Sequence, residues 1–333
     1  MSLYADIDLL STRELLGLPP VRYLMDGLIP EEGFVGLYGA PASGKSFIAL
    51  DWAMCISEGR PWLGTYRTTQ TPVVYVAAEG GRGIQQRVAA WMRHYGYRDL
   101  GAMYFLLNPL YVREEGVVEE FIDHLIDIDV RPGLIVLDTL SRSFGGGEEN
   151  ASADMGEFVD QMTRLASATR MAALVVHHKN ATGTRERGST AFRGAADAMF
   201  SCSADRDKAT NRIIRVELVN DKQKDGAEAE PIYLAPIADV TKSLVFEQCE
   251  APAKKDKGTG VPQPMRKVDM LTYLGGAENG LTFTEWRLGT GVPKATFKRR
   301  LNKLMVDREI YKDDNGRYFV YPNNVDLIDE EDD

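Results

Sequence analysis

A glycine-rich loop is the segment of this chain whose residue types and spacing most clearly specify chemistry. Its residues fit the phosphate-binding pattern G-x-x-x-x-G-K-[ST] without a mismatch, and they are Gly39, Ala40, Pro41, Ala42, Ser43, Gly44, Lys45 and Ser46. In such a loop, backbone N–H groups and the N-terminus of the following helix surround a polyphosphate. Lys45 is expected to reach the β- and γ-phosphates, and the Ser46 hydroxyl is expected to ligate Mg²⁺. The sequence therefore predicts a site for Mg²⁺ and a nucleoside triphosphate, with ATP as the expected nucleotide.

Polar residues at the ends of three apolar runs are the other candidates for this site. Glu79 ends the run VVYVAAE, Asp138 ends LIVLD, and His177 and His178 end AALVVHH. We expect Asp138 to hold the Mg²⁺ shell and Glu79 to polarise the attacking water. Neighbouring residues of a strand point to opposite faces, so at most one histidine faces the nucleotide, and His178 is preferred. The alternatives are acids that only cap the next helix and a histidine with a purely structural hydrogen bond.

The elements that must position these residues alternate between strands and helices. The expected strands are Phe34–Tyr38, Val73–Ala78, Met103–Leu107, Leu134–Leu137, Ala172–Val176 and Ile213–Val219, with a helix over Phe47–Ile56 directly after the loop. Continuous apolar runs of this kind are typical of strands that are buried on both faces. The expected fold class is therefore α/β, with a mostly parallel sheet flanked by helices. Ligands of such sheets bind at the carboxyl ends of the strands, where the candidate residues lie.

Composition excludes several other classes of protein. The chain has 333 residues, of which 44% are hydrophobic and 26% are charged, as in an ordinary soluble globular protein. Three scattered cysteines without a C-x-x-C pair predict neither a disulfide framework nor a zinc site. No apolar run reaches the ~18 residues that span a bilayer, and the first residues lack the pattern of a signal peptide. We therefore expect a cytoplasmic protein without a membrane partner.

Charge, proline and glycine divide the chain into four parts. We expect an ATPase domain over residues 1–249, a flexible linker over 250–264, a small second domain over 265–321 and an acidic tail over 322–333. The whole chain has a net charge of −10, but the second domain has 11 Lys and Arg against 7 Asp and Glu. The tail has six acids and no base, so it is a candidate for recruiting a replication protein.

Over residues 15–235 the motifs resemble those of the RecA-like ATPases of the RepA type, the hexameric helicases of plasmids and phages. The resemblance rests on the order GAPASGKS, VVYVAAEGG, LIVLDTLSR, VVHHKN and RGSTAFRGAADAMF. It implies that Glu79 is the catalytic glutamate, that Asp138 is the Walker B acid and that His178 senses the γ-phosphate. It also implies a RecA-like P-loop fold and a ring, in which each nucleotide site between subunits is completed by a basic residue of the neighbour.

Lys222 and Lys224 are the expected source of that basic residue. They follow the run RIIRVELVN and resemble the paired lysines that RecA-like proteins use in trans. The family more often has an arginine in this region, and Arg215 is the rival candidate. The alternative without a function is a solvated charged turn, DKQKDG.

Two long segments, Ser141–Asp154 and Lys179–Arg193, are expected to be loops with a function. Both are rich in Gly, Ser and Thr and are poorly periodic, and the second contains four basic residues against one acid. RecA-like proteins place their DNA-binding loops here. We therefore expect Arg185, Arg187 and Arg193 to bind the phosphates of single-stranded DNA, with an ordinary solvent loop as the alternative.

The second domain is expected to be a winged helix. Its predicted elements are helices over Arg266–Leu274, Thr284–Leu288 and Lys294–Val306, a turn over 291–293, and a hairpin formed by residues 309–311 and Arg317–Tyr321. One face of the third helix presents basic residues that could contact DNA, namely Lys294, Lys298, Arg299 and Lys303. Winged helices also mediate protein contacts, and both interpretations remain open.

These features predict an ATP-dependent DNA motor, most closely a ring-forming, hexameric replicative-type helicase that hydrolyses Mg-ATP at subunit interfaces. One alternative is a RecA-like recombination or DNA-loading ATPase without unwinding activity. Another is a DNA-binding regulator that ATP switches. Glu79 argues against the regulator, because a pure switch needs no carboxylate that activates water.

Overall fold

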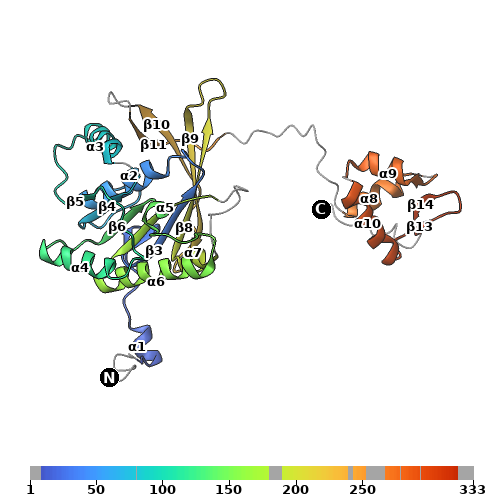
Figure 1. The fold of residues 1–333 in the computed structure, drawn as a ribbon. Helices are drawn as coiled ribbons and strands as arrows, with labels where there is room; N and C mark the ends of the chain where they lie inside the picture. Colours follow the sequence, from blue (N-terminus) through green and yellow to red (C-terminus); the bar gives the residue numbers. More distant parts are fainter. Residues whose placement is uncertain are drawn as a thin grey trace. The chain divides into compact units, whose positions relative to one another are not determined.

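The computed structural model describes residues 9–79, 81–179, 190–238, 243–252, 267–277, 279–292 and 294–321. The chain divides into two compact units, Met1–Ala251 and Pro252–Asp333. Figure 1 colours the first unit from blue to light orange and the second from orange to red. Within the described ranges, no helix is long and apolar enough to cross a membrane.

A nine-stranded sheet with the order β11-β10-β9-β8-β3-β7-β6-β4-β5 forms the centre of the first unit (Figure 1). The six parallel strands are β3 (Gly33–Gly39), β4 (Val73–Ala77), β5 (Met103–Leu106), β6 (Leu134–Asp138), β7 (Ala172–His178) and β8 (Ala198–Arg206). Three antiparallel strands extend the sheet beyond β8, namely β9 (Ile213–Gln223), β10 (Ile232–Ala238) and β11 (Leu244–Gln248). The prediction of a mostly parallel α/β sheet is confirmed.

Helices cover both faces of the parallel strands because each of these strands is apolar on both sides. In β6, Leu134 and Val136 join the core under α2 (Lys45–Glu58) and α3 (Gly81–Tyr95). Ile135 and Leu137 of the same strand join the core on the opposite face. The helices of that face are α4 (Val117–Asp127), α5 (Leu140–Ser143), α6 (Ser152–Thr169) and α7 (Thr190–Ala195).

A buried carboxylate ties α2 to its neighbours. Asp51 accepts hydrogen bonds from the indole Nε1 of Trp91 on α3 at 2.6 Å and of Trp62 at 2.7 Å. Burial raises the pKa of Asp51 to about 6, and the two indole bonds act in the opposite direction. The helix that follows the phosphate-binding loop is therefore fixed against α3 by polar as well as apolar contacts.

The N-terminal segment precedes the sheet. A short helix, α1 (Thr12–Leu16), begins with a capping box between Ser11 and Glu14 and has no buried residue. It is followed by a small antiparallel hairpin of β1 (Tyr23–Met25) and β2 (Ile29–Pro30), whose apolar side chains join the core.

The second unit contains three helices and a three-stranded antiparallel sheet of order β12-β14-β13 within its described residues. Its elements follow the order α8 (Lys267–Gly275), β12 (Leu281–Thr282), α9 (Phe283–Thr290), α10 (Lys294–Val306), β13 (Ile310–Lys312) and β14 (Arg317–Val320). Trp286 and Phe297 lie at the centre of a separate core, with ring centroids 5.2 Å apart. The three expected helices and the expected hairpin are present, and the winged-helix interpretation stays a prediction.

Several expected boundaries were wrong. Lys222 does not follow its strand, because β9 continues through Gln223. Arg193 is not in a loop but in α7, where Phe192 is buried against Phe34. Both ends of the segment expected as a loop over Ser141–Asp154 are helical, and they belong to α5 and α6.

Candidate nucleotide site

The loop Gly39–Ser46 joins the carboxyl end of β3 to the start of α2. Glycine is needed at two of its positions. A Cβ atom on Gly39 would lie 2.3 Å from the carbonyl oxygen of Cys202 on the adjacent β8, and Gly44 has a φ of 99°, in the left-handed region. Because α2 begins at Lys45, the unpaired N–H groups of its first turn lie at the loop, as an anion site requires.

Two polar side chains of the loop are buried. The Lys45 ammonium donates to the carbonyl oxygens of Gly39 at 3.0 Å and Ala40 at 2.8 Å, and burial lowers the pKa of Lys45. The buried Ser43 hydroxyl has no hydrogen-bond partner among the described residues. Since buried polar groups are normally paired, an unpaired hydroxyl beside Lys45 fits a ligand that supplies oxygen atoms.

Ser46 and Asp138 form a pair of oxygen groups next to the loop. The Ser46 hydroxyl donates to Oδ1 of Asp138 at 2.9 Å, and the Tyr75 hydroxyl donates to Oδ2 at 2.7 Å. Mg²⁺ prefers such oxygen ligands and is commonly held by one or two carboxylates together with substrate phosphates. The described residues contain no group of three or more His, Cys, Asp and Glu that could hold a metal alone. The pair therefore fits Mg²⁺ that a nucleotide brings with it.

Glu79 and His178 lie together at the ends of β4 and β7. Oε1 of Glu79 accepts a hydrogen bond from the Thr139 hydroxyl at 2.8 Å and lies 3.8 Å from Nε2 of His178. The Glu79 side chain is 48% exposed, so one carboxylate is both held in place and open to water. Burial lowers the pKa of His178, and the positive charge of Lys45 lowers it further. His177 points to the opposite face, where it is buried against the Phe192 ring.

These side chains surround one cavity of about 310 Å³. Its lining includes the loop residues from Ala42 to Phe47 together with Glu79, Thr139 and His178. A smaller cavity of about 130 Å³ adjoins it and includes Asp138. The structure thus brings together the residues expected to bind phosphate and Mg²⁺ and the two expected to act at the γ-phosphate.

Two arginines at this cavity were missed by the sequence analysis. Arg87 of α3 lines both cavities, and its guanidinium lies 4.7 Å from the centroid of the Phe47 ring. Arg206, at the end of β8, donates to the carbonyl oxygen of Ala42 in the loop. A signal for Arg87 was available, because it lies two turns into the helix that begins just after Glu79.

Replacing Arg87 by alanine is expected to lower ATP hydrolysis about 10- to 100-fold, because a cation beside transferring phosphates stabilises their developing charge. The turnover rate at saturating ATP measures this effect. Arg93→Ala is the matched control, since Arg93 lies on the same helix outside both cavities. Equal turnover in the two variants would remove Arg87 from the site.

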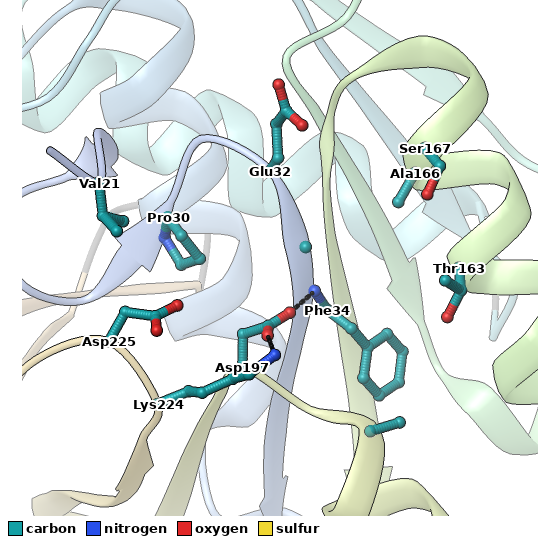
Figure 2. A pocket seen from close by; sticks show the side chains of 12 residues that line it. Val21, Pro30, Glu32, Phe34, Thr163, Ala166, Ser167, Asp197, Lys224 and Asp225 are labelled. Carbon is teal, nitrogen blue, oxygen red and sulfur yellow. Dashed lines mark hydrogen bonds and ion pairs between the residues drawn. The ribbon is translucent and has the colours of Figure 1, made fainter. Parts of the chain in front are cut away.

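Lys222 and Lys224 do not line this cavity. Lys222 donates to the carbonyl oxygens of Arg193 at 2.9 Å and Gly194 at 3.1 Å. Lys224 forms an ion pair of 3.1 Å with Asp197, whose other carboxylate oxygen accepts from the Phe34 N–H group at the amino end of β3. Figure 2 shows Lys224 and Asp197 at a separate cavity, which has a volume of about 370 Å³.

The rival and the DNA-binding candidates lie elsewhere. Arg215 forms an ion pair with Asp205 on β8. Arg193 donates to the carbonyl oxygen of Asp221 at 3.1 Å, whereas Arg185 and Arg187 lie outside the described residues. In the second unit the four basic candidates of α10 are all exposed, namely Lys294, Lys298, Arg299 and Lys303.

The fold and the cavity define a class of protein. The phosphate-binding loop follows β3, the acid Asp138 ends β6, and β7 lies between these two strands and ends in His178. This arrangement is that of a RecA-like P-loop ATPase. The AAA domain family matches residues 8–184, which is more than half of the chain, and the chain belongs to this family. The protein is accordingly an ATP-hydrolysing P-loop enzyme.

Two solved structures are similar to this chain at low sequence identity. One is a KaiC-like protein from the hyperthermophilic archaeon Pyrococcus horikoshii OT3, with 15% identity, a TM-score of 0.49, and coverage of 68% of this chain and 99% of that one. The other is the ATPase domain of a second protein, with 16% identity, a TM-score of 0.46, and coverage of 66% of this chain and 86% of that one.

Proposed function

We propose that this ATPase is a DNA motor, and specifically a ring-forming, hexameric replicative-type helicase that hydrolyses Mg-ATP between subunits. One observation supports this proposal above the others. The cavity contains a water-accessible carboxylate, Glu79, whereas the lysines Lys222 and Lys224 lie outside it, toward the amino end of β3. A neighbouring copy could supply them to the site.

Each residue of the cavity has a proposed role in hydrolysis. Lys45 exchanges its contacts with two loop carbonyls for contacts with the β- and γ-phosphates. Ser46 and Asp138 would hold Mg²⁺, which neutralises phosphate charge when it is bound. Glu79 accepts a proton from the attacking water, and Thr139 fixes its orientation. His178, next to Glu79, donates a hydrogen bond toward the γ-phosphate region.

Exposed apolar surfaces support self-association. The N-terminal segment exposes a set of leucines, namely Leu9, Leu10, Leu15, Leu16 and Leu18. A second apolar surface is a groove of about 480 Å³ between α3 and β5, which includes Val88, Met92, Phe105 and Leu107. Contiguous apolar surfaces of this kind mark sites of protein contact. We propose that neighbouring copies cover them.

Single-stranded DNA is the proposed substrate track, with Arg185, Arg187 and Arg193 and the basic face of α10 as its contacts. The proposed domains are an ATPase domain over 1–249, a linker over 250–264 and a winged helix over 265–321. The acidic tail over 322–333 is proposed to recruit a replication protein.

Two assays test the proposed function. The rate of ATP hydrolysis is measured with and without single-stranded DNA, and strand displacement is measured on a forked duplex. A helicase is expected to show a DNA-stimulated rate and ATP-dependent displacement. Stimulation without displacement would favour the recombination or loading ATPase, and slow hydrolysis that ignores DNA would favour the ATP-switched regulator.

Deleting residues 261–333 is expected to leave a folded ATPase, because the two units have separate cores. Circular dichroism and basal ATP turnover test this expectation. In the full chain, reversing the charges of Lys298, Arg299 and Lys303 is expected to weaken DNA binding and to flatten its dependence on salt, because fewer counterions are released. An unchanged salt slope would assign this surface to protein contacts.

A further inference from the structure

Tyr75 lies behind the carboxylate of Asp138, on the side away from the nucleotide cavity. It is the central residue of β4 and is fully buried, whereas Asp138 ends the adjacent β6. Asp138 and Ser46 line the smaller cavity at the site, and Tyr75 is absent from its lining. Tyr75 therefore contacts the proposed metal-binding residues without facing the nucleotide.

The hydroxyl of Tyr75 has a single proton, and geometry assigns it to Asp138. Its distance to Oδ2 of Asp138 is 2.7 Å, whereas its distance to the carbonyl oxygen of Ser46 is 3.4 Å. The shorter contact has the length of a good O–H···O⁻ bond, and the longer one does not. The two oxygens of Asp138 are thus divided, since Oδ2 is bound to Tyr75 and Oδ1 to the Ser46 hydroxyl.

This division has a consequence for metal binding. The terminal torsion of an aspartate is broad, so an unrestrained carboxylate can rotate and exchange its two oxygens. A buried donor on one oxygen stops that rotation and leaves the other oxygen at Ser46. We propose that Tyr75 is a positioning residue that fixes Asp138 so that Oδ1 alone addresses the Mg²⁺ shell. This inference rests on the proposed role of Asp138.

Tyr75→Phe removes the hydroxyl and keeps the ring, which makes it the direct test. Partners of metal ligands typically change metal affinity 10- to 100-fold when they are lost. We expect about a 10-fold higher Mg²⁺ concentration at the midpoint of Mg²⁺-dependent binding of a fluorescent ATP analogue. Binding of the same analogue in EDTA is expected to change less than about twofold, because Tyr75 does not face the nucleotide. Mn²⁺ binding by electron paramagnetic resonance gives a second, activity-free measurement.

Two further variants separate the possible outcomes. Tyr233→Phe is the matched control, because the Tyr233 hydroxyl also donates to a carboxylate, that of Glu217 at 3.0 Å, on the antiparallel part of the sheet. Asp138→Asn tests the metal site itself. If Asp138→Asn alters the Mg²⁺ midpoint and Tyr75→Phe does not, the role of Tyr75 is wrong and the site stands. If neither alters it, the assignment of Asp138 is wrong as well.

A spectroscopic measurement covers the case in which Tyr75→Phe does not fold. 3-Fluorotyrosine at position 75 keeps the hydroxyl and places a ¹⁹F nucleus next to it. Adding Mg²⁺ to the nucleotide-bound protein is expected to shift this resonance, because the metal draws charge from the carboxylate that the hydroxyl contacts. The same label at position 233 is expected to stay unchanged. An unshifted signal at position 75 would overturn the inference.

Discussion

Lys45→Ala and Glu79→Gln are both expected to reduce ATP hydrolysis at least about 100-fold, but only Lys45→Ala is expected to weaken ATP binding strongly. The Lys45 ammonium lies in the loop and contacts phosphate before the reaction begins, whereas Glu79 acts on the attacking water. Turnover rates and the dissociation constant of a fluorescent ATP analogue measure the two effects separately.

The carboxylate of Glu79 offers a sharp form of this test. Glutamine keeps the size of the side chain and can still accept the hydrogen bond of Thr139, so the variant is expected to fold and to bind ATP. Glu58→Gln is a suitable control, because Glu58 ends α2 away from the loop. Near-normal turnover of the Glu79 variant would mean that another group activates the water.

Mixing two inactive variants is expected to restore part of the ATPase activity. One variant has Glu79→Gln with both lysines intact, and the other has Lys222→Ala and Lys224→Ala with Glu79 intact. In a mixed ring, some interfaces pair an intact Glu79 with an intact pair of lysines from the neighbour. A positive charge supplied in trans stabilises the transferring phosphoryl group, so these interfaces are expected to hydrolyse ATP.

The contacts of the two lysines decide which control is needed. Lys222 donates to two carbonyls at the end of α7, and Lys224 pairs with Asp197, so the double variant also removes contacts within its own chain. Melting temperatures of the variants must therefore be compared first. Arg215→Ala in place of the lysine variant tests the rival residue. If mixed oligomers form and neither mixture regains activity, hydrolysis does not depend on a basic residue of the neighbour.

Much of the parallel half of the fold could be predicted from the sequence, because strands buried on both faces leave continuous apolar runs. All six expected strands are present, and LIVLD and AALVVHH end where their polar residues indicated. The strands β8, β10 and β11 were missed. They are shorter in apolar content and mix buried with exposed residues, and β10 contains Pro236, which argues locally against a strand.

The candidate site was predictable only where one motif or one strand end specified a residue. Lys45, Ser46 and Asp138 follow from such local patterns. Arg87 and Tyr75 reach the site through packing between α3, β4 and β6, and no local pattern records that packing. The buried Asp51 is a similar case, since its partners Trp62 and Trp91 are 11 and 40 residues away in the chain.

The positions of Lys224 and the phosphate-binding loop restrict the symmetry of any assembly. Lys224 is anchored through Asp197 to Phe34 at one end of β3, and the loop leaves β3 at Gly39. If the lysine of one copy reaches the loop of the next, two different surfaces meet, and the contact is heterologous rather than two-fold. Repeating such a contact yields a closed ring when the rotation between copies divides a full turn, and a helical filament when it does not. A small change in that rotation would therefore convert one assembly into the other.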